Sequence, residues 1–280
     1  MIRRMGLVFM ILISMYACAA APDKRPKITF SPGTRIGLVN MLESYATHTH
    51  FSSMSTERFT KTYDVDWKMP TDVEDKLMKL LQNEQRYRLI AIRHTESSDF
   101  VQHAKDFSDL ANSGTITPGF ADKLERLAEA SNVDVIILIY SYNGPSIFTY
   151  NAPSAQYNPA KAPIWLQGYG LFSRWLNPAN LLRWLPFRGA YPYAHIAVSV
   201  FTSQPLTWIA TGKPKLTATS ISAFDWPDSV KNLPLTELNK ARPGVDRYAD
   251  QAIQNALQQS NLLPSKPPSV PQPPGTPPPR

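Results

Sequence analysis

The sequence contains a single cysteine, Cys18, so no disulfide within the chain can stabilise the fold. It has no apolar run of the about 20 residues that a membrane-spanning helix requires. It also lacks the H-E-x-x-H and C-x-x-C metal motifs, the G-x-S-x-G nucleophile elbow and a phosphate-binding glycine loop. These absences remove the strongest sequence signals for a metalloprotease, a serine hydrolase and a nucleotide-binding enzyme.

The amino-terminal residues carry an export pattern. Two arginines precede an apolar run over residues 5–15, and a small residue stands directly before Cys18. Residues 15–18 resemble the lipobox of bacterial lipoproteins, in which the signal peptide is removed before the cysteine and the thiol receives a diacylglyceryl group. The resemblance implies that Cys18 is acylated. Because Ala19 rather than aspartate follows, it also implies the outer membrane. Ordinary secretion into the periplasm after an A-x-A site is the alternative.

The charge of the mature chain bears on its surroundings. Without residues 1–17 the chain holds 27 basic and 22 acidic residues, a net charge of +5. This modest charge is spread along the chain, whereas nucleic-acid-binding proteins gather basic residues on one face or carry a recognisable motif. It suits anionic phospholipid, lipopolysaccharide or peptidoglycan carboxylates. We therefore expect the membrane and peptidoglycan, and not nucleic acid, as partners. The missing metal and phosphate-binding motifs lead us to expect no cofactor.

Hydrophobic patterning predicts alternating strands and helices. Near-continuous apolar runs indicate buried strands, and helical spacing of apolar residues indicates amphipathic helices. The predicted strands are 35–42, 87–93 and 133–142, then a hairpin of 195–202 and 206–211 extended by 215–222; the predicted helices are 72–84, the segment between Thr117 and Asn132, and 245–257. We predict an α/β fold in which three parallel strands with crossover helices, a β-hairpin and a C-terminal helix pack on one mixed sheet.

The remaining segments define the predicted domain organisation. Residues 1–17 form the signal peptide, 18–34 a lipidated tether and 35–263 one α/β domain. Within it, residues 43–69 are predicted to be a long connection. Residues 143–192, rich in proline, glycine and aromatic residues, are predicted to be an aromatic insertion without long alternating strands. From residue 264 nine of 17 residues are proline, so 264–280 is predicted to be disordered or polyproline II.

The predicted order of elements resembles an α/β domain of the bacterial envelope. The curli-secretion lipoprotein, the lipoprotein activators of penicillin-binding proteins and the amino-terminal domain of TolB share this domain. The resemblance covers about residues 35–263 and depends on element order and on the runs 134–140 and 196–212. Members of these groups bind envelope proteins or assemble pores and are not enzymes. The resemblance therefore implies an adaptor or assembly role, and the predicted lack of long strands in 143–192 argues against a pore.

Several histidines are predicted to gather at one edge of the sheet. They follow the ends of the first two parallel strands, whose carboxyl ends meet at one edge. The set is His48, His50, His94, Asp99 and His103. Imidazoles and a carboxylate are suitable zinc ligands. The spacing leaves three interpretations open: a zinc site, a ligand pocket without metal, or exposed loop histidines. An envelope hydrolase or a ligand-binding protein that uses this edge is the alternative function.

A stretch within residues 168–193 interleaves arginines with aromatic side chains. Its candidate contact residues are Arg174, Trp175, Arg183, Trp184, Phe187 and Arg188. Such residues suit a protein interface, a membrane surface, or a segment that covers one face of the sheet. From these patterns we predict a non-enzymatic, lipid-anchored periplasmic protein that scaffolds or regulates an envelope assembly by protein–protein binding.

Overall fold

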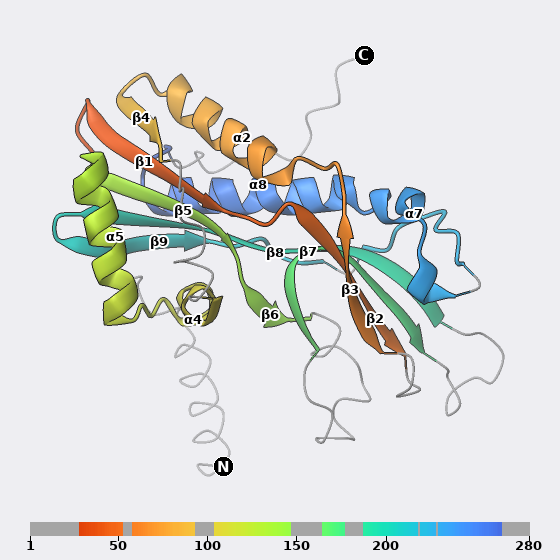
Figure 1. Cartoon of the computed structure of the whole chain (residues 1–280). Helices are drawn as coiled ribbons and strands as arrows, with labels where there is room; N and C mark the ends of the chain where they lie inside the picture. The colour runs from red at the N-terminus through yellow and green to blue at the C-terminus, as the bar shows by residue number, and fades with distance from the viewer. Residues whose placement is uncertain are drawn as a thin grey trace, which may run out of the picture.

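The computed structural model describes residues 28–52, 58–92, 104–146, 164–176, 187–217, 219–227 and 229–264. Figure 1 shows one curled, mixed sheet with helices on both faces. In chain order the elements are β1 (Thr34–Met41), β2 (Tyr45–Ser52), β3 (Phe59–Asp64), α2 (Met69–Asn83), β4 (Tyr87–Ala91), α4 (Ala104–Ser113), α5 (Pro118–Ser131), β5 (Val135–Ser141), β6 (Asn143–Pro145), β7 (Trp165–Leu176), β8 (Phe187–Ser203), β9 (Leu206–Gly212), η3 (Val230–Asn232), α7 (Leu235–Asn239) and α8 (Arg242–Gln259).

The described part of the sheet holds nine strands in the order β3-β2-β7-β8-β5-β1-β4, with β6 on β7 and β9 on β8. β1 pairs in parallel with β4 and β5, and β2 pairs in parallel with β7. The other pairs are antiparallel. The long strand β8 joins the two halves of the sheet. Its first half pairs with β7, and its second half pairs with β5 and β9.

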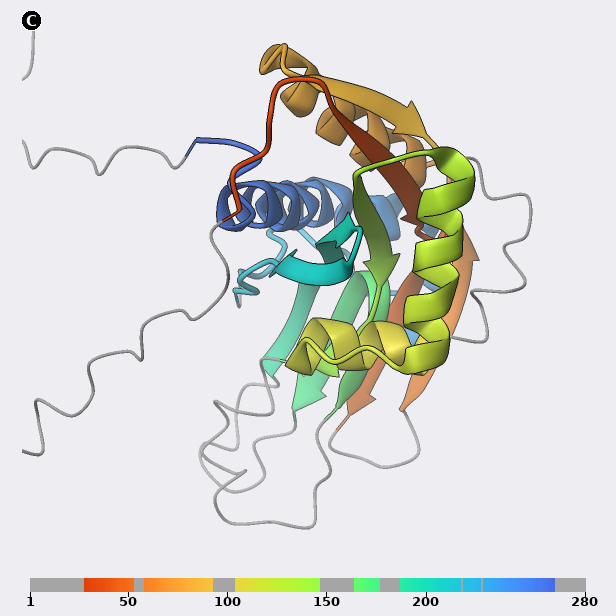
Figure 2. The same ribbon diagram turned by 90° about the vertical axis from the view of Figure 1, so that its left-hand side faces the viewer.

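Helices cover both faces of the half of the sheet that contains β1, as Figure 2 shows. On one face, α2 and α8 bury apolar residues such as Leu77 and Ile253. On the other face, Phe107 of α4 stacks on Tyr140 of β5 with ring centroids 5.0 Å apart, and Phe120 of α5 meets Phe107 edge-on. Burial of these faces supplies the main stabilisation of the domain, at about 25 cal/mol per Å² of apolar surface.

The mixed α/β class predicted from the sequence is confirmed. The periodic segments that predicted helices form α2, α5 and α8, and the predicted hairpin forms from β8 and β9. Thr117 is extended before α5, and Asn132 adopts a left-handed conformation with φ 52° and ψ 53° at its end. Threonine before the helix and asparagine after it therefore predicted both ends of α5 correctly.

Four segment predictions are wrong. Residues 43–69 contain β2 and β3. The supposed insertion 143–192 contains the short strand β6 and, in the centre of the sheet, β7 and the start of β8. The described residues of 215–222 form no strand. The predicted tether overlaps the fold, because Phe30 is buried in the core and β1 begins at Thr34. In β2 threonine alternates with histidine, so both faces of the strand are polar and the usual apolar alternation is absent.

Gly170 is required where β2 and β7 approach one another. Its φ is +149°, and a Cβ there would lie 2.0 Å from the backbone oxygen of Thr47. We expect Gly170→Ala to lower the free energy of unfolding by about 3 kcal/mol, because strain and overpacking add. The melting temperature should fall by roughly 6–12 °C. Gly119→Ala is the control, since a Cβ there meets nothing within 4 Å. Equal melting temperatures for both variants would contradict this account of the strand pairing.

Candidate functional site

An open pocket of about 310 Å³ lies between β2, β3, β6 and β7. Its walls carry hydroxyl and amide groups, one carboxylate and two exposed aromatic rings, and we call it the threonine pocket. It is lined by Glu43, Tyr45, Thr47, Thr49, Thr60, Thr62, Asn143, Trp165, Gln167, Gly168 and Tyr169. Its volume lies at the lower end of the range of about 300–1,000 Å³ that is common for small-molecule sites.

The register of two antiparallel strands places four threonines on one face. Thr47 pairs with Thr62, and Thr49 pairs with Thr60, whose hydroxyl oxygen lies 3.2 Å from that of Thr49. The Thr47 hydroxyl contacts the Tyr169 carbonyl oxygen at 3.2 Å and the hydroxyl of Tyr193. Thr47 therefore holds β2 against β7, whereas Thr62 makes no side-chain hydrogen bond within the described part of the chain.

Glu43 is fixed at the entrance to β2. Its carboxylate accepts a hydrogen bond from Ser141 Oγ at 2.5 Å, and its backbone oxygen accepts one from the Tyr169 hydroxyl, also at 2.5 Å. Burial and the charge of Glu43 together raise the pKa of Tyr169, which stays a neutral donor. No lysine or arginine lines the pocket, so its single formal charge is negative.

The opposite face of β2 carries a buried cluster of His48, His50 and Ser173. Ser173 Oγ lies 2.7 Å from His48 Nε2 and 2.8 Å from His50 Nδ1. Because a hydroxyl has one proton, Ser173 donates to one imidazole and accepts from the other. The exposed fractions of the His48, His50 and Ser173 side chains are 0%, 2% and 0%, and none of the three lines the threonine pocket. A serine beside histidines is a feature of hydrolases, but this burial keeps the serine out of reach of a substrate.

Within this cluster His48 is held neutral. Burial, followed by the charges of His50 and Lys61, lowers the pKa of His48 from 6.5 to about 3. Phe59 packs on both imidazoles, with ring centroids 5.2 Å from His48 and 5.5 Å from His50. The arrangement is that of a structural polar network inside the fold.

His195 is the third buried histidine, and it lies under β6. Both of its ring nitrogens lack a hydrogen-bond partner in the described part of the chain. A Cβ on Gly144 would lie 2.3 Å from His195 Nδ1, so the glycine of β6 leaves the space that the ring occupies. Burial, followed by the charge of Lys213, lowers the pKa of His195 to about 4.

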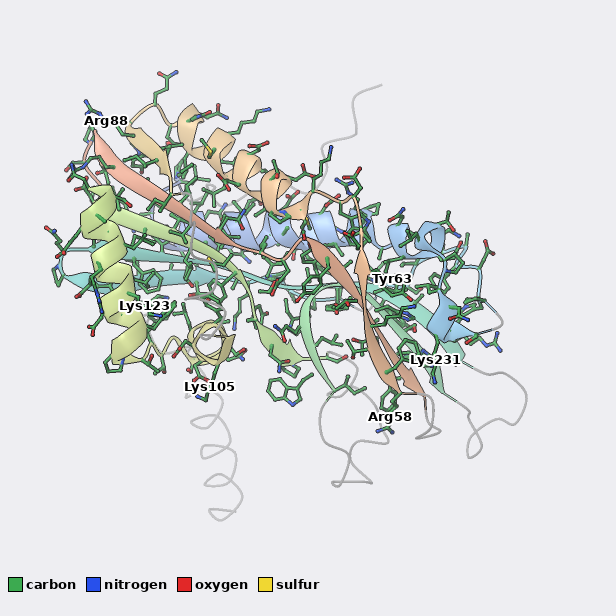
Figure 3. The ribbon with its side chains drawn as sticks, viewed as in Figure 1. Arg58, Tyr63, Arg88, Lys105, Lys123 and Lys231 are labelled. Carbon is green, nitrogen blue, oxygen red and sulfur yellow. The ribbon has the colours of Figure 1, made fainter. Side chains whose placement is uncertain are left out.

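Arginines stack on aromatic rings at the far ends of β2, β7 and β8. The guanidinium carbon of Arg58 lies 4.3 Å from the Phe51 ring centroid, that of Arg174 lies 5.4 Å from Tyr191, and that of Arg188 lies 5.9 Å from Trp226. We call these six residues the strand-end surface; they lie at one end of the strands, with Arg188 and Trp226 on the opposite face of the sheet from Arg174 and Tyr191. Figure 3 shows Arg58 next to the start of β3. Lys61 Nζ donates to the Lys231 carbonyl oxygen at 3.2 Å, so further cations lie close by.

The sequence-predicted site residues are only partly brought together. His48 and His50 lie inside β2, so their predicted position in a loop after the first strand is wrong. Cys18, His94, Asp99, His103, Arg183 and Trp184 lie outside the described residues. Trp175 and Phe187 are described only as backbone positions at the facing ends of β7 and β8. Arg174 and Arg188 are at the strand-end surface.

Sequence reasoning missed the threonine pocket altogether. Its residues come from five segments between Glu43 and Tyr169, and they meet only because β2 pairs with both β3 and β7. The alternating threonines at 47, 49, 60 and 62 were the available signal, because they place hydroxyl groups on one face of two strands.

The described residues contain no group of three or more histidine, cysteine, aspartate or glutamate side chains that could hold a metal ion. None of the described helices is long and apolar enough to cross a membrane. No protein-family model matches the chain, and no curated protein matches it significantly.

Proposed function

We propose that the chain is a lipid-anchored, non-catalytic protein of the bacterial envelope that docks other envelope proteins and so scaffolds or regulates an assembly. The acylated Cys18 fixes it to the outer membrane, facing the periplasm. The unit of β1, β4 and β5 with its connecting helices forms the rigid body, in keeping with the resemblance to envelope adaptor domains. Parallel pairing of β1 with both neighbours supports this part of the proposal.

The strand-end surface is the observation that carries the docking proposal. Its guanidinium groups lie over aromatic rings, and the side chains of Arg58 and Arg188 are exposed. Arginine and large aromatic residues concentrate binding energy in protein interfaces. Guanidinium groups are cationic and favour carboxylate partners. The partner therefore presents an acidic surface.

The two ends of the domain suit an anchored docking protein. Residues 28–34 lie beside the start of β4 and the end of α8. Gly33 N donates a hydrogen bond to the carbonyl oxygen of Arg86, which precedes β4. Asn261 Nδ2, which follows α8, donates one to the carbonyl oxygen of Ile28. Figure 3 shows Arg88 of β4 at the other end of the molecule from Arg58. The ten residues from Cys18 to Ile28 reach about 35 Å at most. The lipid therefore attaches at one end, and the docking surface lies at the other.

Substitution of two arginines tests the docking proposal. We expect Arg174→Ala combined with Arg188→Ala to reduce recovery of chemically cross-linked partner from intact envelopes by about tenfold or more, because hot-spot residues each contribute about 2 kcal/mol. Arg88→Ala is the matched control, since it removes an exposed arginine at the opposite end. Thermal melting of each variant separates lost docking from lost folding. Unchanged recovery from a folded double variant would contradict the proposal.

The alternative function at the histidine edge is not favoured. His48 and His50 face Ser173 inside the fold and are buried, so they do not contribute to an accessible zinc or ligand site in this structure. The contribution of His94, Asp99 and His103 stays a prediction from the sequence.

A further inference from the structure

The threonine pocket has exposed aromatic side chains at its walls, which the preference of threonine for strands does not explain. Threonine is common in strands, so four threonines alone would be ordinary. However, the three most exposed large apolar side chains of the described residues are Tyr45, Trp165 and Leu235, and the first two flank this pocket. Their exposed fractions are 41% and 52%. Exposed aromatic rings on both sides of a polar floor indicate a surface that another molecule covers.

The floor of the pocket still has hydrogen-bonding capacity. In the described part of the chain, the side chains of Thr62, Asn143 and Gln167 form no hydrogen bond with the protein. A hydroxyl and two carboxamides both donate and accept hydrogen bonds. Glu43 adds a carboxylate that is held in place by Ser141. The pocket therefore matches a ligand with many hydroxyl or amide groups, which can both donate and accept hydrogen bonds.

Charge and polarity narrow the class of ligand. With one carboxylate and no cation in the lining, the pocket disfavours phosphates, carboxylates and other anions. The polar floor disfavours an acyl chain, because it would leave the hydroxyl and amide groups without partners. A sugar ring satisfies both conditions. Its hydroxyls bond to the floor and to Glu43, while its C–H face packs on an aromatic ring.

We propose that the threonine pocket binds a neutral oligosaccharide. Trp165 and Tyr45 pack on the faces of the sugar rings. Thr62, Asn143 and Gln167 bond to sugar hydroxyl or acetamido groups, and Glu43 accepts from a sugar hydroxyl. Thr47 positions the floor by bonding to the carbonyl oxygen of Tyr169. This binding is independent of protein docking at the strand-end surface, whose arginines do not line the pocket.

Titration of the full-length chain with defined sugars tests the proposal. The probes are N-acetylchitotriose and maltotriose, which are neutral, and trigalacturonate, which is anionic. The protein is kept in a detergent without a sugar headgroup, and binding is followed by saturation-transfer NMR. We expect at least one neutral probe to bind, with trigalacturonate weaker. Trp165→Ala should weaken binding by about tenfold or more, which corresponds to about 1.4 kcal/mol.

Matched variants make the result decisive. Leu235→Ala removes an equally exposed apolar side chain outside the pocket, and we expect it to leave sugar binding unchanged. The Arg174→Ala, Arg188→Ala variant should also bind sugar normally, so failure of docking and failure of sugar binding are distinguishable. The proposal is overturned if neither neutral probe binds, if Trp165→Ala binds as well as the unsubstituted chain, or if trigalacturonate binds most tightly.

Discussion

Acidification from pH 7 to pH 5 should lower the free energy of unfolding by about 4 kcal/mol through His48 and His195 alone. Both imidazoles are held neutral in the folded chain, with pKa values lowered to about 3 and about 4. In the unfolded chain each binds a proton near pH 6.5. Their stabilising contribution is therefore complete above pH 6.5 and is lost as the pH falls toward the folded pKa values.

Denaturant unfolding at pH 7 and pH 5 measures this effect. His195→Leu is the informative variant, because the ring nitrogens of His195 have no hydrogen-bond partner in the described residues. We expect it to remove about half of the difference between the two pH values. If the unsubstituted chain unfolds equally at both pH values, or if His195→Leu retains the full difference, the buried neutral histidines are not the cause of acid sensitivity.

Cys18→Ser should remove the chain from the outer-membrane fraction. Each buried CH₂ of an acyl chain contributes about 0.8 kcal/mol, so two or three chains anchor a protein firmly, whereas a serine at this position carries none. We expect intact-mass spectrometry to detect the acyl groups on Cys18 of the unsubstituted chain and none on the variant. Density-gradient fractionation of envelopes from the native host then measures how much of the unsubstituted chain and of the variant is in the outer-membrane fraction.

Ser14→Ala is the control for the anchoring experiment, because it keeps the apolar run of the export signal and leaves Cys18 intact. We expect this variant to fractionate with the outer membrane. A mature chain that begins beyond residue 18 and carries no fatty acid would contradict the anchoring proposal. So would equal outer-membrane recovery of the Cys18→Ser variant.

The sequence predicted those helices and strands whose apolar residues recur at regular spacing and whose buried positions are apolar. The apolar face of α8 and the almost entirely apolar strand β5 are predicted correctly, because each shows its regular pattern within its own segment. The hairpin of β8 and β9 was found from its β-rich segments on either side of a turn. These segments fix the α/β class and the core between β1, β5 and their helices.

The strands β2 and β7 and the first half of β8 could not be predicted from their own segments. β7 contains Gly168 and Gly170, and β8 contains Gly189 and Pro192, residue types that usually interrupt strands. Here pairing on both sides of β7 overrides that tendency, and Gly170 permits the close approach of Thr47. The sequence pattern predicts a loop at the histidines of β2, because both faces of this strand are polar and the usual apolar alternation is absent.

The candidate sites also contain some residues that a single segment of the sequence indicates and others that only the fold brings together. The sequence pattern predicts Arg174 and Arg188 of the strand-end surface, because arginines interleaved with aromatic residues indicate an interface, but it does not predict Arg58. The aromatic partners Phe51 and Trp226 are not predicted either, because Phe51 lies in the segment 43–69 that was expected to be a connection and Trp226 lies far along the chain from Arg188. The threonine pocket required the register of three strands, which no single segment encodes.

Site-specific photo-crosslinking in the native host tests the central claim most directly. A photoreactive residue is introduced at position 188 of the anchored chain, and in a second chain at position 88. The account predicts a discrete cross-link to one envelope protein from position 188, lost when Arg174→Ala is added, and no such product from position 88. The same products from both positions, or none from position 188, would contradict docking at the strand-end surface.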